Sequence, residues 1–240
     1  SCADILTVLY FNQMNINPQK PDAEGRDRFV LSKGHCSPAL YATLARKGYF
    51  DKELLKTFRK IGSNLQGHPD MKKISGVDMT TGSLGQGLSA AVGMALSAKL
   101  SSDSYRVYTL LGDGEIQEGQ VWEAAMFARH YHLHNLTAIV DHNHMQAMGD
   151  CTQVMDLLDL AEKWRAFGWH VISVENGNDH DQLRAAFSQP STDTPTCIIA
   201  NTVKGKGVSY MENTLLWHYR DPQGDAFETA MKELGANDHA

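Results

Sequence analysis

The main signal for the fold is the stretch Val107-Tyr108-Thr109-Leu110-Leu111-Gly112-Asp113-Gly114, in which an apolar run of strand length leads directly into a glycine-rich turn. A helical pattern follows over Val121–His132, and a second apolar run, Leu136–Val140, then leads into Asp141-His142-Asn143. Strand, helix and strand of these lengths predict a parallel βαβ unit. Both strands would end at the same edge of the sheet, where open α/β folds bind their ligands.

The same alternation continues on both sides of this unit. Five strands are predicted, at Arg28–Leu31, Arg106–Leu111, Leu136–Val140, His170–Val174 and Thr196–Val203. Five helices are predicted, at Ala39–Lys47, Leu84–Leu100, Val121–His132, Leu157–Phe167 and Asp181–Phe187. Two loops are expected, at Asn15–Gly25 and Gly62–Val77. This pattern indicates an α/β fold, with a mostly parallel sheet and helices on both of its faces.

The chain of 240 residues is interpreted as a single domain, 1–240. From about residue 204 the alternation gives way to an irregular extension that contains Gly, Asn and His, with a terminal helix expected over Asp225–Leu234.

The composition excludes several classes of partner. A net charge of −6 argues against nucleic-acid binding, which needs clustered Lys and Arg. No apolar run approaches the roughly 20 residues of a membrane-spanning helix, and the start of the chain lacks the basic region of a signal peptide. The four cysteines are widely spaced, as expected of free thiols in a reducing compartment. We therefore expect a cytoplasmic protein.

Asp113 and Asn143 are candidate metal ligands. They are 30 positions apart in sequence, yet each follows one of two adjacent strands and would face the other across a few ångströms. Their oxygens suit Mg²⁺ or Ca²⁺, which would complete its coordination with diphosphate oxygens and water. Gly112 and Gly114 would let backbone N–H groups approach a phosphate. Taken alone, Gly-Asp-Gly is also common turn chemistry, so the interpretation depends on the whole arrangement.

These residues resemble the thiamine diphosphate motif, in which Gly-Asp-Gly is followed by Asn about 30 residues later. Further segments are similar to transketolases in the same order: RDRFVLSKGH (26–35), GHPD (67–70), TTGSLGQGLSAAVGMA (80–95), GDGEIQEGQVWEA (112–124) and GWHVI (168–172). The resemblance covers nearly the whole chain. It corresponds to the N-terminal, diphosphate-binding third of a transketolase and implies the thiamine diphosphate-binding fold of a PP-type domain.

The resemblance implies a ligand set for the metal and its cofactor. Asp113, the side chain of Asn143 and the backbone carbonyl of Met145 would bind Mg²⁺, with Ca²⁺ or Mn²⁺ as alternatives, and Gly114 would contact the diphosphate. Gly82, Ser83 and Leu84 match a loop, usually Gly-Pro-Leu, that lies against the cofactor. Ser83 departs from the usual Pro, which makes the loop less rigid. The helix after this loop would favour a nearby anion through its dipole. Gly85, Gly87 and Gly93 also fit close helix packing.

Three histidines and a lysine complete the predicted site. His35 resembles a histidine beside the cofactor, His68 one that contacts the donor sugar near its C1 hydroxyl, and His218 one that reaches both cofactor and substrate. Lys204 matches a lysine that contacts the cofactor in some branches. At position 219 Tyr replaces the usual Gly, which puts the role of His218 in doubt. The other histidines, at 130, 132, 134, 142, 144, 170, 180 and 239, are expected to be solvated or structural.

Three residues carry alternative interpretations. His142 and His144 flank Asn143 so closely that a zinc site is a second hypothesis, although no further ligand pair completes a tetrahedron. Glu118, at the start of the helix after Gly114, either complements the helix dipole or, as the resemblance implies, is a buried carboxylate at a subunit contact that links paired active sites and contributes to cofactor binding.

The implied activity is transfer of a two-carbon ketol unit from a ketose phosphate to an aldose. The family's catalytic glutamate belongs to a pyrimidine-binding domain that this chain lacks. The chain is therefore either one subunit of a split transketolase, with an α2β2 assembly, or a fragment of a longer protein; its end at the family's domain boundary favours the first.

Two other hypotheses remain: another thiamine diphosphate enzyme, such as deoxyxylulose-phosphate synthase or an oxo-acid dehydrogenase E1, or a non-catalytic assembly or regulatory paralogue. Split transketolases serve the pentose phosphate pathway and other sugar pathways, so the sequence leaves the donor and acceptor open.

Overall fold

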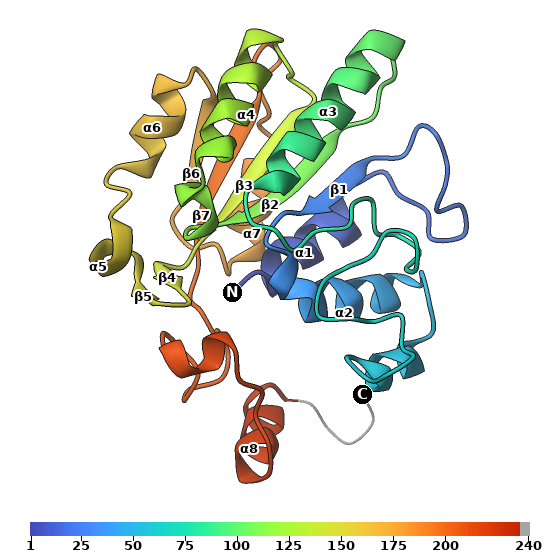
Figure 1. Ribbon diagram of the computed structural model, residues 1–240, viewed down its shortest axis with the longest axis vertical. Helices are drawn as coiled ribbons and strands as arrows, with labels where there is room; N and C mark the ends of the chain where they lie inside the picture. Colours follow the sequence, from blue (N-terminus) through green and yellow to red (C-terminus); the bar gives the residue numbers. More distant parts are fainter. Residues whose placement is uncertain (236–240) are drawn as a thin grey trace.

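The five expected strands form one sheet in the computed structural model, which describes residues 1–235 (Figure 1). The strand order is β1-β2-β3-β7-β6, and every neighbouring pair is parallel. The bounds are β1 (Arg28–Leu31), β2 (Val107–Gly112), β3 (Leu136–His142), β6 (His170–Val174) and β7 (Thr196–Asn201). The predicted fold class is confirmed.

The strand ends differ from the prediction by one or two residues. β2 begins at Val107, because the backbone N–H of Arg106 donates to the carboxylate of Asp27 at 2.8 Å. β2 and β3 extend further at their carboxyl ends, where Gly112 pairs with Asp141. The predicted end of β7 at Val203 is wrong: the strand stops at Asn201. The two central strands therefore run right up to the predicted metal-binding turn.

One face of the sheet is covered by α1 (Ala3–Val8), α2 (Ser37–Lys47) and α7 (His180–Phe187). Side chains alternate along a strand, so every second strand residue points to this face. The apolar strand residues packed here are Phe29, Leu31, Tyr108, Leu110, Ile139, Val174, Ile198 and Ala200.

The opposite face is covered by α3 (Gln86–Ser101), α4 (Gly119–His130) and α6 (Leu160–Ala166), and Figure 1 shows α3 and α4 lying along the strands. The strand residues packed on this side are Val30, Val107, Leu111, Leu136, Ala138, Val140, Val171, Cys197 and Ile199. Helices thus lie on both faces, as predicted, and the central strands are buried between two apolar layers.

Several short elements were not predicted. α1 continues as a π-helical turn over Leu9–Gln13, and a 3-10 segment occupies Lys52–Thr57. A two-residue hairpin, β4 (Met145–Gln146) and β5 (Gly149–Asp150), leads into α5 (Cys151–Met155). The expected loops at 15–25 and 62–77 contain no helix or strand. The short elements lack a long apolar period, which is why the sequence pattern did not indicate them.

The glycines of α3 have different environments. A Cβ on Gly87 would lie 2.4 Å from Oγ and 2.6 Å from the Cα of Ser32, so the helix touches the end of β1 through this residue. Gly85 precedes the helix with a φ of 83° and lies against α4. Gly93 has no atom within 4 Å of such a Cβ, so the packing interpretation is wrong there. The helix starts at Gln86 rather than at Leu84.

Beyond β7 the chain runs below the carboxyl edge of the sheet (Figure 1). It forms a 3-10 turn at Leu215–His218 and then α8 (Asp225–Glu233), close to the predicted terminal helix. Tyr210 donates to the carbonyl of Ala226 at 2.6 Å and packs edge-on against Trp217 at 5.1 Å. His239 lies outside the described residues, and the single-domain interpretation of 1–240 remains a prediction. No described helix is long and apolar enough to cross a membrane.

Candidate functional site

Asp113 and Asn143 meet at the carboxyl ends of β2 and β3. The Asp113 carboxylate accepts the backbone N–H of His144 at 2.6 Å, so it touches the residue directly after Asn143. The Asn143 side-chain oxygen accepts the N–H of Met145 at 3.0 Å. Asp113 is 1% exposed and Asn143 is 5% exposed. The structure therefore brings the predicted acid and amide, with Met145, into one buried turn.

The surroundings of the Asp113 carboxyl disfavour its ionised form. Burial, together with the nearby negative charge of Asp141, raises its pKa to about 6. A divalent cation beside this carboxylate would favour the ionised form and offset this effect. A buried carboxylate, an amide oxygen and a backbone carbonyl are the hard donors that Mg²⁺ and Ca²⁺ take. The donor set fits such an ion.

Gly114 is required by the close approach of the β4 hairpin. A Cβ at Gly114 would lie 2.6 Å from Oε1 and 2.8 Å from Cβ of Gln146. Any larger residue would push β4, which begins at Met145, away from Asp113. The glycine therefore has a packing role in addition to the predicted contact with a diphosphate.

Glu115 is a buried carboxylate that sequence reasoning missed. Its Oε1 accepts the hydroxyl of Ser32 and, at 2.9 Å, the N–H of Gly85, while Oε2 accepts the N–H of Gly112 at 3.1 Å. The anion at the start of α3 is thus the protein's own glutamate. That the dipole of α3 also favours a nearby ligand anion stays a prediction.

A second missed pair, Lys33 and Asp141, lies beside the turn. Lys33 Nζ is 2.7 Å from Asp141 Oδ2, and the carboxylate also accepts hydroxyls of Ser1, at 2.6 Å, and Thr202. Although burial opposes both charges, each partner stabilises the other: the pKa of Lys33 is well above its usual value and the pKa of Asp141 is lowered. The pair is ionised at neutral pH. The signal available from the sequence was the position of Lys33 just after β1.

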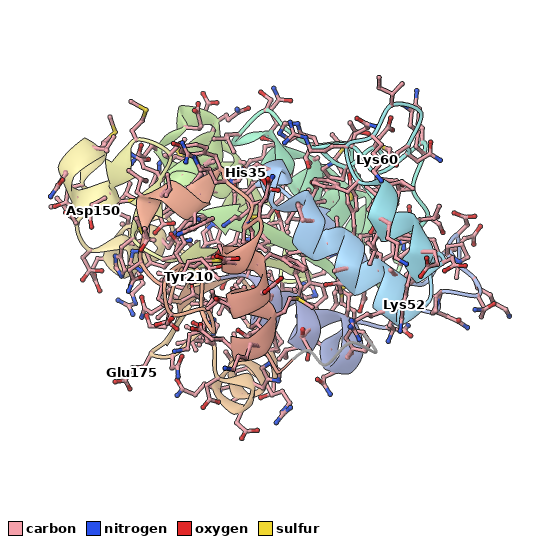
Figure 2. The ribbon with its side chains drawn as sticks, turned by 90° about the horizontal axis from the view of Figure 1, so that it is seen from below. His35, Lys52, Lys60, Asp150, Glu175 and Tyr210 are labelled. Atoms are coloured by element: carbon pink, nitrogen blue, oxygen red, sulfur yellow. The ribbon has the colours of Figure 1, made fainter. Side chains whose placement is uncertain are left out.

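His35 and His218 lie together although 183 positions separate them in sequence. Their rings stack with centroids 5.6 Å apart and 26° between planes. Desolvation, followed by the charge of Lys33, lowers the pKa of His35 to about 4. The residue as a whole is exposed, so solvent screening weakens this effect, but its direction leaves the ring neutral at neutral pH. Figure 2 shows His35 at the start of α2, facing the C-terminal segment.

His218 and Lys204 are donors without partners in the described chain. Burial, followed by the charge of Lys204, lowers the pKa of His218 to about 4. The buried Nδ1 of His218 has no hydrogen-bond partner among residues 1–235. Burial and the charge of Lys33 lower the pKa of Lys204. A polar, anionic ligand would satisfy this group of donors.

The comparisons with known proteins agree with this geometry. Residues 1–240 match the family described as the transketolase, thiamine diphosphate binding domain. The chain belongs to the transketolase family. It is 48% identical to the 6-deoxy-6-sulfo-D-fructose transketolase subunit SqwG of Clostridium sp., over 98% of this chain and 86% of that protein. It is 44% identical to one of the subunits of the apulose-4-phosphate transketolase of Phocaeicola vulgatus, over 98% of this chain and 83% of that protein.

The solved transketolase from Campylobacter jejuni has the same fold, with a TM-score of 0.89 and 33% identity. The match covers 96% of this chain but only 37% of that enzyme. This chain therefore spans about a third of the solved enzyme, and most of the two subunits named above.

The loop resembling the transketolase Gly-Pro-Leu segment lies against His68, another predicted site residue, and is hydrogen-bonded to α4. A Cβ at Gly82 would lie 3.1 Å from the ring of His68, which is exposed. Ser83 is also exposed, and the carbonyl of Leu84 accepts Gln120 Nε2 from α4 at 3.0 Å. One hydrogen bond from α4 thus reaches the end of this loop, and His68 lies next to Gly82.

Glu118 precedes α4, is exposed, and makes no side-chain capping hydrogen bond. Within residues 1–235 the buried carboxylate close to this position is Glu115. The role of Glu118 at a subunit contact stays a prediction.

The zinc hypothesis gains no support. The rings of His142 and His144 have centroids 4.0 Å apart, but Nδ1 of His142 pairs with Oδ1 of Asn201 at 2.9 Å. Within residues 1–235 no three His, Cys, Asp or Glu side chains are arranged to hold a metal. The proposed ligand set of Asp113 and Asn143 is of a different kind, because it combines one carboxylate with amide and backbone oxygens.

Proposed function

We propose that this chain is the thiamine diphosphate- and metal-binding subunit of a two-chain transketolase. The enzyme would transfer a two-carbon ketol unit from a ketose phosphate to an aldose. The proposal rests mainly on one observation: Asp113 and Asn143 are both buried and lie close together at the ends of β2 and β3. The relatives named as transketolase subunits, matched over 98% of this chain, support the two-chain form.

The metal would be held by Asp113, the Asn143 amide and the Met145 carbonyl, with Mg²⁺ as the expected ion and Ca²⁺ or Mn²⁺ as substitutes. Asn143 Oδ1 accepts a backbone hydrogen bond and retains acceptor capacity for an ion. The metal would neutralise part of the diphosphate charge and orient it over Gly114.

The remaining donors would bind cofactor and sugar. Lys204 and the unsatisfied Nδ1 of His218 would contact the cofactor, and the loop at 82–84 would lie against it. When bound, thiamine diphosphate would supply a nucleophilic carbon for the ketose carbonyl and an electron sink for the pair released when the adjacent carbon–carbon bond breaks. His35, His68 and His218 would hydrogen-bond the sugar hydroxyls. Since the pKa values of His35 and His218 are lowered to about 4, their rings are neutral and can both donate and accept.

The partner would supply the glutamate that acts on the pyrimidine ring. An α2β2 assembly would place each active site between this chain and a pyrimidine-domain subunit. The exposed His68, Ser83 and Glu118 lie around the site and would be covered there.

The test is calorimetric titration of thiamine diphosphate with Mg²⁺ into the complex of both chains. The matched variants are Asp113→Asn and, as a control, Asp103→Asn at an exposed position after α3. Loss of the charged ligand should weaken binding by more than about 100-fold, since even changes to residues that only support metal ligands cost 10–100-fold. Asp103→Asn should bind like the wild type.

The accompanying assay uses xylulose 5-phosphate with ribose 5-phosphate, and separately pyruvate. Ketol transfer that needs both chains supports the proposal. Turnover of pyruvate would indicate another thiamine diphosphate enzyme, and binding without any turnover would indicate a non-catalytic paralogue.

A further inference from the structure

Three segments that surround the proposed cofactor site are held together by one carboxylate. Ser32 directly follows β1 and precedes Lys33 and His35; Gly85 follows the loop at 82–84; and Gly112 ends β2 directly before Asp113. Glu115 follows Asp113 and Gly114, and it accepts one hydrogen bond each from Ser32, from Gly85 and from Gly112 of its own segment. It is 2% exposed, so water does not replace these contacts.

These contacts require an acceptor at both oxygens of the carboxyl group. The N–H groups of Gly85 and Gly112 can only donate, and they approach different oxygens of Glu115, at 2.9 and 3.1 Å. Both oxygens must therefore accept.

The backbone segments around this carboxylate are closely packed. A Cβ on Gly87 would strike Ser32, and a Cβ on Gly34 would lie 2.9 Å from the backbone N of Gly82. The end of β1, the loop at 82–84 and the start of α3 are therefore in direct contact. A shift of Glu115 would move the loop relative to Asp113.

We propose that Glu115 is a positioning residue that sets the distance between the loop at 82–84 and the metal-binding turn at 113–114. It touches neither metal nor cofactor; it acts by holding Gly85 and Gly112. The inference rests on the proposed function, because the quantity that it controls is the fit of the metal–diphosphate group between those two segments.

The decisive variant is Glu115→Gln, which keeps the shape of the side chain but replaces one acceptor oxygen by an NH₂ group. In either orientation that NH₂ faces a backbone N–H, of Gly85 or of Gly112, so one segment must move. Ser32→Ala removes one hydroxyl donor and leaves both backbone contacts. Glu175→Gln is the matched control, because Glu175 is exposed and lies at the rim of the molecule, far from His35 in Figure 2.

The measurement is the Kd of thiamine diphosphate, at saturating Mg²⁺, for the complex with the partner subunit, together with the KM for cofactor and the kcat of ketol transfer. For Glu115→Gln we expect Kd and cofactor KM to rise by about 10–100-fold, the range for lost support of a metal site. The kcat at saturating cofactor should stay within about twofold, because Glu115 does not touch the reacting atoms. Ser32→Ala should raise Kd about threefold to tenfold, as for one lost hydrogen bond.

The outcomes separate a positioning role from a merely structural one. A lower melting temperature with unchanged Kd and cofactor KM in folded Glu115→Gln would overturn the inference. If Glu115→Gln does not fold, Ser32→Ala decides, and an unchanged Kd there overturns it. Failure of the wild-type complex to bind thiamine diphosphate would instead refute the proposed function, and the inference with it.

Discussion

The ammonium of Lys33 and the carboxylate of Asp141 form an ion pair almost wholly removed from solvent. Their side chains are 5% and 0% exposed, and the two charges are 2.7 Å apart. Removing one partner of a buried pair leaves the other charge desolvated, which costs far more than the pair itself contributes. The hydroxyls of Ser1 and Thr202 would then be the remaining donors to Asp141.

We therefore expect Lys33→Met to lower the free energy of unfolding by about 3–5 kcal/mol, measured by urea denaturation. The matched control is Lys56→Met, which breaks a pair of the same 2.7 Å length between side chains that are 74% and 72% exposed. That variant should change stability by less than about 0.5 kcal/mol. Similar losses in both variants would contradict the view that burial makes the Lys33 pair costly to break.

At the scale of single elements, α3 contains two glycines with opposite expected behaviour. Gly87 touches the backbone of Ser32, whereas Gly93 is exposed and has open space around it. An alanine at Gly93 gains helix propensity without any contact to disturb. An alanine at Gly87 gains the same propensity but must push the helix away from β1.

Gly93→Ala should therefore raise the free energy of unfolding by up to about 1 kcal/mol. Gly87→Ala should lower it by about 1–3 kcal/mol, the usual cost of overpacking. Both substitutions lie in one helix and gain the same helix propensity, so the difference between their melting temperatures reports the cost of the contact with Ser32. Equal shifts of melting temperature in the same direction would show that α3 does not press on Ser32 in solution.

At the scale of the whole molecule, the C-terminal segment joins the site through Lys204 and His218 while its other contacts are mainly internal. Ser209 bonds Glu233, and Tyr210 bonds Ala226, within the segment itself. Arg220 is exposed and lies in a stretch without helix or strand before α8. If the segment docks on the cofactor, binding should hold it closed.

Trypsin should therefore cut after Arg220 in the free chain, and thiamine diphosphate with Mg²⁺ should slow that cut. At a cofactor concentration ten times its Kd, we expect roughly tenfold protection if cleavage needs the segment to open. Cleavage after Lys52, which is exposed and lies well apart from Tyr210 of the C-terminal segment in Figure 2, is the internal control. Equal slowing at both sites would show general stabilisation, and no slowing at Arg220 would refute docking.

Much of the architecture could be predicted because it depends on neighbours close in sequence. All five strands were located within two residues, since buried parallel strands are short, nearly continuous apolar runs. The convergence of Asp113 and Asn143 also followed from the sequence, because a right-handed βαβ unit brings both strand ends to one edge. The transketolase motifs added the expected roles of His35, His68 and Lys204, which remain predictions.

Tertiary structure alone decided which charges are buried and what they touch. Lys33 meets Asp141 across 108 positions, and Ser32 meets Glu115 across 83, so no local pattern could pair them. It also decided that Glu115 is buried and hydrogen-bonded, whereas Glu118, three residues later, is exposed before α4. The sequence by itself determined the strands, their common edge and the residue types delivered there, because periodicity and chain handedness are local rules. Which donors are left unsatisfied, and which glycines have no room for a side chain, depend on the approach of distant segments, and only the packed fold decides that.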